Sequence, residues 1–283
     1  MDHRLHIGIL VEGRYLTHAQ PAGMSAALRA HGHHVTLIDP DATSFEMGDD
    51  NWLEGLDIIV ARGRSQALLC LLAWAEARGV LTINRRDAVA GVQNKADMAV
   101  ALSAGNVPTP CTFLGRVEEL AGQVPSASYP LILKPIFGDN CRGLCIVETP
   151  DELTGLEWPE PAALAQQYLP NDGYDLKLYA VGDEIWAVRK PSPFNGLRTS
   201  LPASLAGHSS KAELLPLTPA LQELGRRCSE LFGLDLYGVD CIQTSDGPVV
   251  IEVNDFPNYT GVPDADERLA DYVMWRARKE PGS

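Results

Sequence analysis

The sequence lacks the long apolar runs and cysteine patterns that mark several large classes of protein. No stretch of 18 apolar residues occurs, and the first apolar run is short and ends at Glu12, so we expect neither a membrane span nor a secretory leader. The six cysteines form no C-x-x-C pair, and the seven histidines show no metal-ligand spacing. We therefore expect a cytoplasmic protein with reduced thiols and no zinc site.

Positive charge is also scarce. Lys and Arg total 23 against 37 Asp and Glu, which gives a formal net charge of −14. So acidic a chain repels nucleic acid and anionic lipid, and its densest basic cluster, at 276–279, is more simply the cationic end of a last helix. We expect no nucleic-acid or membrane partner. Homodimers are common among proteins in general, and this alone suggests a homodimer.

Two common nucleotide-binding motifs are missing as well. The chain contains no G-x-x-x-x-G-K-[ST] run, and no G-x-G-x-x-G follows the first strand, so a Walker site and a Rossmann dinucleotide site are both disfavoured. A length of 283 residues with 45% hydrophobic residues nevertheless predicts an ordinary globular protein of two or three lobes.

The N-terminal third alternates predicted strands and helices, which indicates a parallel sheet. The strands are expected at residues 5–11, 35–39, 57–61 and 80–83. In such sheets the ligand crevice lies beyond the carboxyl ends of the strands, where this chain places Arg14, Arg62 and Arg64. We name these arginines as substrate contacts, with capping of the next helices as an equally weighted alternative.

The strongest chemical signal is a predicted hairpin near the C-terminus. If its turn is centred on Asp246, Asp240 lies opposite Glu252, and Asn254 points to the same face. Oxygen ligands of this kind suit Mg²⁺. The alternative is that both carboxylates face solvent on the polar side of the hairpin. The two strands are expected at residues 238–244 and 249–255.

A second signal is a strand that delivers Lys134 into a loop containing Gly138 and Gly143. Glycine lets backbone N–H groups approach phosphate oxygens, and the lysine adds a point charge. In so acidic a chain, additional cations on the following strands are consistent with a polyphosphate ligand. These further cations are Lys177, Arg189, Lys190 and Arg198.

The order of these parts resembles the ATP-grasp superfamily over about residues 90–262. Within it the chain is most similar to the ribosomal-protein glutamate ligase (RimK-like) group of carboxylate–amine ligases. The resemblance rests on Lys95, Lys134 with its glycine loop, residues 166–169, residues 175–177, Asp240, Glu252 and Asn254. It implies an α/β and α+β chain, with an ATP-grasp fold preceded by a parallel-sheet lobe. The expected lobes are 1–94, 95–165 and 166–283.

The resemblance also implies a role for each matching residue. Arg198 would stabilise the transferring phosphoryl group, with Lys177 and Lys190 as further catalytic cations, and Asn258 joins the substrate contacts. Two Mg²⁺ ions, for which Mn²⁺ could substitute, would be held by Asp240, Glu252 and Asn254. The implied ATP contacts are Lys95, Lys134, Gly138, Arg142, Gly143, Gln167, Tyr168, Leu169 and Asp175.

The implied reaction is ATP-dependent ligation. A carboxylate of a small molecule or peptide would be activated as an acyl phosphate, and an amine would displace phosphate to form an amide. Residues 138–143 and 191–212 are candidate lids that exclude water, with a disordered crossover as the alternative for the second segment.

Two other functions stay open at this point. Lys177, where the ligase group usually has Arg, and the segment 255–261 are similar to inositol phosphate kinases, which share the ATP-grasp fold. A kinase acting on an inositol phosphate or related cyclitol is therefore one alternative, and a non-catalytic ATP sensor is another. A polyphosphorylated acceptor would need many cations, so the acidic composition favours the ligase.

Overall fold

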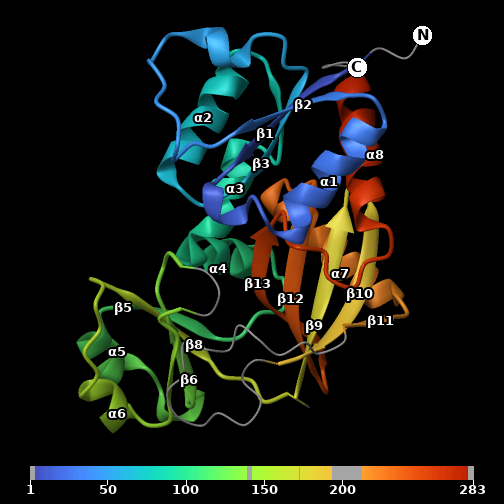
Figure 1. Ribbon diagram of the computed structural model, residues 1–283. Coiled ribbons are helices and arrows are strands. Elements are labelled where there is room, and N and C mark those ends of the chain that lie inside the picture. The colour runs from blue at the N-terminus through green and yellow to red at the C-terminus, as the bar shows by residue number, and fades with distance from the viewer. Residues whose placement is uncertain (1–3, 139–141, 172, 193–211, 280–283) are drawn as a thin grey trace.

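The computed structural model describes residues 4–138, 142–171, 173–192 and 212–279 (Figure 1). Its strands form three sheets, which we call the N-terminal, central and C-terminal sheets. In Figure 1 the N-terminal sheet lies above the other two, which stand side by side below it. The spaces between the three sheets are where the candidate site lies.

The N-terminal sheet is parallel, in the order β2-β1-β3-β4, as the alternation of strands and helices predicts. Helices pack on it, so the runs of β1 and β3 are apolar and buried. The strands are β1 (His6–Val11), β2 (His34–Ile38), β3 (Ile58–Arg62) and β4 (Leu81–Ile83). The helices are α1 (Ala19–Ala30), α2 (Gln66–Ala77) and α3 (Arg86–Gln93), with short 3₁₀ turns at Gly13–Tyr15 and Asp50–Leu53.

The central sheet is antiparallel, in the order β5-β8-β6-β7. It follows α4 (Lys95–Ala104), which begins at Lys95 because the Asn94 side chain accepts hydrogen bonds from two backbone N–H groups of the first turn. β5 and α5 were not predicted from the sequence. The elements are β5 (Thr112–Gly115), α5 (Val117–Gln123), a 3₁₀ turn at Ser126–Ser128, β6 (Leu131–Lys134), β7 (Cys145–Val147), α6 (Pro150–Thr154) and β8 (Ala163–Gln167).

The C-terminal sheet is antiparallel, in the order β11-β10-β9-β12-β13. Helix α7 covers one face of this sheet with an apolar cluster that includes Leu178, Leu221 and Tyr237. Helix α8 packs instead against α1, beside the N-terminal sheet (Figure 1). The elements are β9 (Tyr174–Val181), β10 (Glu184–Pro191), β11 (Glu213–Leu215), α7 (Pro219–Phe232), β12 (Leu236–Thr244), β13 (Gly247–Asp255) and α8 (Ala265–Arg278).

The N-terminal and C-terminal sheets share a core and a buried amide. The side chain of Asn84 donates to the carbonyl of Leu236 (2.7 Å) and accepts from the backbone N–H groups of Asp235 and Leu236. The same apolar cluster contains Ile9 of β1, Tyr179 of β9 and residues of α8. This contact fixes the carboxyl ends of β1 and β3 above the start of β12 and the end of β13, which pair with one another.

Some expectations from the sequence concern the whole chain. Within the described ranges no helix has the length and apolar character needed to cross a bilayer. The described cysteines at positions 70, 111, 145, 228 and 241 are free thiols, and Cys141 lies outside the described residues. The expected lobe boundaries at 94/95 and 165/166 stay predictions; the second falls within β8.

Candidate active site

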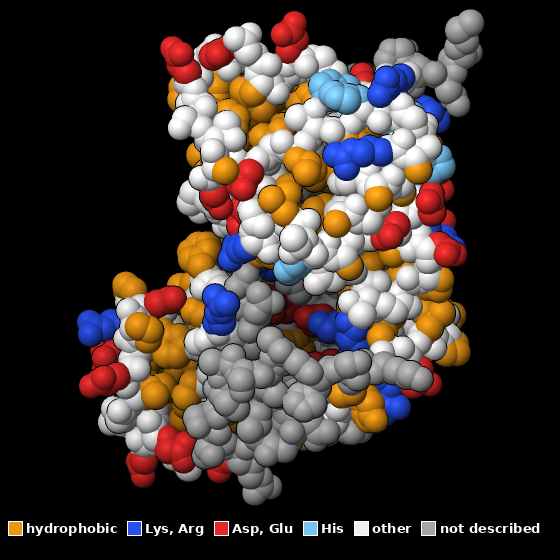
Figure 2. All heavy atoms as spheres, in the orientation of Figure 1, with side chains coloured by type: hydrophobic (Ala, Val, Ile, Leu, Met, Phe, Trp, Pro, Cys, Tyr) orange, Lys and Arg blue, Asp and Glu red, His pale blue; other side chains and the backbone are white. Residues whose placement is uncertain are grey.

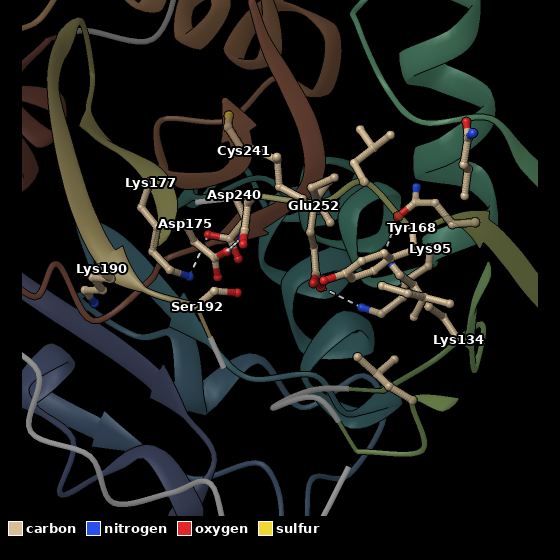
Figure 3. Close-up of a pocket in the computed structure, with 18 of the residues that line it drawn as sticks. Lys95, Lys134, Tyr168, Asp175, Lys177, Lys190, Ser192, Asp240, Cys241 and Glu252 are labelled. Carbon is tan, nitrogen blue, oxygen red and sulfur yellow. Dashed lines mark hydrogen bonds and ion pairs between the residues drawn. The ribbon is translucent and has the colours of Figure 1, made fainter. Parts of the chain in front are cut away.

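A cavity of about 320 Å³ lies between the central and C-terminal sheets (Figure 3); we call it cavity A. It brings together nearly all the residues that the sequence assigns to ATP, from α4, β6, β8 and β9 and from the loops that follow β6 and β8. The exception is Gly143, which lines a hollow beside Pro135 and Trp158. The ATP contacts predicted from the sequence that line cavity A are Lys95, Lys134, Gly138, Arg142, Gln167, Tyr168, Leu169 and Asp175.

The two-residue period of the strands explains which polar side chains line this cavity and the space next to it. Lys177 and Tyr179 of β9 point away from α7, whereas Leu176 and Leu178 pack beneath it. Asp240 lies directly opposite Lys177 in the β9–β12 ladder. The face of the C-terminal sheet that α7 leaves uncovered therefore carries the candidate chemistry.

The β12–β13 hairpin pairs Asp240 with Glu252, as predicted, but it does so by a different route. The turn closes between Thr244 and Gly247, so its centre lies before Asp246 rather than on it. That shorter turn alone would place Asp240 opposite Ile251. A β-bulge at Ile251 adds one residue to β13 and restores the pairing with Glu252.

Each of the three predicted metal-ligand residues accepts a hydrogen bond from a cationic side chain. Two of these contacts are drawn as dashed lines in Figure 3. The three cations come from three different segments, α4, β9 and the turn after β3. The pairs are Lys95 Nζ with Glu252 Oε1 (2.6 Å), Lys177 Nζ with Asp240 Oδ1 (2.7 Å) and Arg64 Nη2 with Asn254 Oδ1 (3.0 Å).

The donor set fits a hard divalent cation, although it contains only two carboxylates. In the part of the chain that the structure describes, no three His, Cys, Asp or Glu side chains gather as a metal site. A site here therefore needs the amide oxygen of Asn254 beside Asp240 and Glu252. Two carboxylates, one amide oxygen and ligand phosphates are suitable ligands for Mg²⁺.

The partly buried charges of the site shift one another's pKa values. Burial lowers the pKa of Lys177, but Asp240, together with Tyr179 and Asp175, outweighs burial, so this pKa is raised overall. Burial raises the pKa of Glu252, yet Lys95, Lys134 and Arg64 together lower it more, so the carboxylate stays charged. Lys190 donates to the hydroxyl of Tyr179 (3.0 Å), and its pKa falls to about 8 through burial and then through the like charge of Lys177.

A second cavity, of about 330 Å³, lies between the N-terminal sheet and the ends of β12 and β13; we call it cavity B. Figure 2 shows the molecule hollowed at this level, with acidic and basic side chains together in the hollow. From the N-terminal part it is lined by Tyr15, His18, Arg62 and Arg64, and from the segment after β13 by Asn258. Both cavities are lined by Lys177, Lys190, Asp240 and Glu252.

The predicted substrate contacts occupy different places. Arg62 is buried, stacks with the rings of Tyr15 and Phe256, and donates to the carbonyl of Pro257 (3.1 Å) and to Asn258 Oδ1 (2.9 Å). Arg62 and Asn258 are thus partners in this structure. Arg14 pairs with Glu12 and is not among the residues that line either cavity.

Some of the predicted residues lie outside the described ranges, and two residues near the cavities were not predicted. Arg198 lies outside the described residues, as do parts of both candidate lids, 138–143 and 191–212. Conversely, the sequence reasoning missed Glu12, which is buried at the end of β1, and Asp255, which lines cavity B. A signal for Glu12 existed, because an acid directly after a buried parallel strand lies at the ligand rim of the sheet.

Comparison with known proteins agrees with this geometry. The family model of the RimK-like ATP-grasp domain matches residues 92–273. A probable alpha-L-glutamate ligase of Thioalkalivibrio sulfidiphilus is 26% identical over 280 residues, which cover 89% of this chain and 90% of the relative.

Two solved structures share the fold. The RimK domain ATP-grasp protein of Sphaerobacter thermophilus superposes with a TM-score of 0.71 and 22% identity, covering 94% of this chain and 98% of that one. The ATP-grasp ligase PsnB, complexed with minimal precursor, Mg and ADP, has a TM-score of 0.71 and 17% identity, covering 96% and 97%.

These comparisons confirm the predicted ATP-grasp fold and the expectation of an enzyme of the ATP-dependent carbon–nitrogen ligase type. They give no support to the kinase alternative, and they favour an enzyme over a non-catalytic sensor. With a match over residues 92–273, the chain belongs to the RimK-like ATP-grasp domain family.

Proposed function

We propose that this protein activates a carboxylate with ATP as an acyl phosphate and joins it to an amine. The observation that supports this most is the meeting of cavities A and B at the same four charged side chains. A nucleotide in cavity A would present its γ-phosphate at these side chains. The carboxylate substrate, which accepts the phosphoryl group and which we call the acceptor, would present its carboxylate there from cavity B. Lys177 and Lys190 would reduce the repulsion between these anions.

The proposed nucleotide position follows the lining of cavity A. Lys95 and Lys134 supply positive charge to phosphates, and both side chains are buried. The backbone around Tyr168 would face adenine, and Asp175 would lie near the ribose. The solved complex of PsnB, a protein of the same fold, contains Mg and ADP, which supports a nucleotide as a ligand of this fold.

Asp240, Glu252 and Asn254 would hold magnesium. A magnesium ion bound there would supply positive charge to the phosphate oxygens. The number of ions and replacement by Mn²⁺ stay predictions. Arg198, assigned to the transferring phosphoryl group from the sequence, also stays a prediction.

The bond changes of the proposed reaction are as follows. An oxygen of the substrate carboxylate attacks the γ-phosphorus of ATP, and the bond from that phosphorus to the bridging oxygen breaks to release ADP. The nitrogen of a neutral amine then attacks the acyl carbon, and the bond to the phosphate oxygen breaks. The proton lost by the amine passes to solvent or to a nearby base, and no protein nucleophile takes part.

The acceptor side favours an anionic substrate. Cavity B is lined by four cations and three carboxylates, and Tyr15 and Tyr179 add aromatic surface; the cations are Arg62, Arg64, Lys177 and Lys190, and the carboxylates are those of Asp240, Glu252 and Asp255. L-Glutamate is the first amine to test, because the relative from T. sulfidiphilus is named a probable alpha-L-glutamate ligase. The carboxylate partner is proposed to be a small molecule or the C-terminus of a peptide.

An assay with hydroxylamine tests the proposal. Hydroxylamine intercepts an acyl phosphate as a hydroxamate, so incubation with ATP, Mg²⁺, hydroxylamine and pools of amino acids or peptides should give ADP, phosphate and hydroxamate together. Release of ADP with a phosphorylated acceptor and no hydroxamate would contradict the proposal.

A further inference from the structure

The last residue of β3 and the turn that follows it, residues Arg62–Ser65, form a segment that is held at each of its four residues; we call it the arginine turn. The carbonyl of Arg62 accepts from the backbone N–H of Glu12 (3.2 Å). The carbonyl of Gly63 accepts from the side chain of the buried Gln93 (2.9 Å). The backbone N–H groups of Arg64 and Ser65 both donate to Glu12 Oε1.

Glu12 is the common partner in this arrangement. Its side chain is 2% exposed, and its second carboxylate oxygen accepts from Arg14 Nε (2.8 Å). The carboxylate also explains Gly63, because a Cβ atom at this position would overlap the oxygen of Glu12 and the side chain of Leu68. Glu12 and Gly63 thus fit together as one unit.

The arginine turn carries two side chains to the predicted metal ligand Asn254 and to the segment that follows it. Arg62 donates to Pro257 and Asn258, and Arg64 donates to Asn254 Oδ1. Both arginines line cavity B. The orientation of the cationic wall of this cavity therefore depends on the backbone of residues 62–65.

We propose that Glu12 is a positioning residue for the acceptor: it holds the arginine turn so that Arg64 faces the acceptor carboxylate and Asn254. This inference rests on the proposed function for the identity of the acceptor. The positioning of the arginine turn by Glu12 does not depend on the proposed function, because the backbone hydrogen bonds of Arg64 and Ser65 to Glu12 report it directly.

A purely structural role for Glu12 is the competing explanation, since a carboxylate near the N-terminus of α2 is favourable in any case. Glu76, within α2, offers a matched control. It accepts from the hydroxyl of Thr82 (2.7 Å) and the backbone N–H of Arg86 (2.7 Å) in the same part of the protein, and it does not line cavity B. Glu76→Ala should therefore lose stability without a selective effect on the acceptor.

The kinetic test compares four variants with the unmodified protein. Glu12→Ala should raise the KM for the acceptor by about 10- to 100-fold, the range for partners that orient a binding group, while the KM for ATP changes by less than about threefold. Glu12→Gln keeps an oxygen acceptor and should restore most of the loss. Arg64→Ala should raise the KM for the acceptor as much as Glu12→Ala does. The double variant Glu12→Ala/Arg64→Ala should raise this KM no further than Arg64→Ala alone. Equal effects on both substrates, or additive effects in the double variant, would overturn the proposal.

Amide hydrogen exchange separates this inference from the proposed function. The backbone N–H groups of Arg64 and Ser65 should exchange faster in Glu12→Ala than in Glu76→Ala, and at close to the normal rate in Glu12→Gln. This result is expected whether or not the ligase assay finds a substrate. Equal exchange in Glu12→Ala and Glu76→Ala would overturn the positioning role even if the enzyme proves to be a ligase.

Discussion

Asp240 lies opposite Glu252 in the β12–β13 ladder because Ile251 is an extra residue in β13. The burial pattern records the same shift, since Val250 and Val253 are both fully buried although they stand three residues apart. An uninterrupted strand would bury alternate residues. The bulge thus turns the end of β13 so that its polar residues share a face with Asp240.

Removing either carboxylate should abolish turnover while the protein stays folded. In Asp240→Asn or Glu252→Gln we expect ATP-dependent turnover to fall by at least about 100-fold, because an oriented charge is lost where the phosphoryl group transfers. Turnover is measured as ADP release, and folding by circular dichroism.

The matched control for these variants is Asp246→Asn, at the exposed turn of the same hairpin. It should leave turnover within about twofold of the unmodified enzyme, as exposed substitutions usually do. Full activity in Asp240→Asn or Glu252→Gln would remove the proposed metal site.

Lys95→Met should destabilise the fold because it leaves Glu252 without its counter-charge. The Lys95 side chain is only 8% exposed and the Glu252 side chain 26%, so the expected cost is about 1–3 kcal/mol, below that of breaking a fully buried pair. Urea unfolding measures it. The double variant Lys95→Met/Glu252→Gln should recover part of the loss, and a double variant as unstable as the sum of the two single ones would refute the coupling.

Arg62→Lys should weaken the contact between the N-terminal sheet and the segment after β13. Lysine has no planar guanidinium to lie over the rings of Tyr15 and Phe256 while also donating to Pro257 and Asn258, so we expect a loss of about 2 kcal/mol in unfolding free energy.

The control is Arg268→Lys, at a residue that stacks over Trp186 and pairs with Glu184 at the surface. It should cost less than about 1 kcal/mol, as exposed pairs do. If the two variants lose equal stability in thermal or urea unfolding, the interpretation of Arg62 is wrong.

The pH dependence of the unfolding free energy should show the lowered pKa of Lys190. Its pKa in the folded protein is about 8, against an ordinary value of 10.5, so between these pH values the unfolded chain binds more protons than the folded one. Stability from this group therefore rises with pH through that window. The unfolding free energy of the unmodified protein minus that of Lys190→Met should increase between pH 8 and 10.5; a constant difference would show that this pKa is not lowered.

Much of the fold could be predicted from the sequence because its local signals are strong. The strand–helix alternation predicts the parallel sheet, Asn94 predicts the start of α4, and residues 181–184 predict the β9–β10 turn. The short strands β5 and β11 were missed, since four and three residues of mixed character carry little periodicity.

Part of the candidate site could likewise be predicted from local patterns in the sequence, and part could not. Side chains on strands, such as Lys134 and Asp240, could be placed because alternation fixes their face. The bulge at Ile251 and the contact of Glu12 with the arginine turn could not be placed. They depend on how distant segments pack together, which no local pattern of residues records.

The most direct measurement of the central claim follows an oxygen atom. With a substrate carboxylate labelled with ¹⁸O, found from the hydroxamate screen, an acyl phosphate pathway must move one labelled oxygen into the inorganic phosphate that is released. We predict labelled phosphate and unlabelled ADP, observed by ³¹P NMR or mass spectrometry. Unlabelled phosphate formed along with the amide would contradict the account.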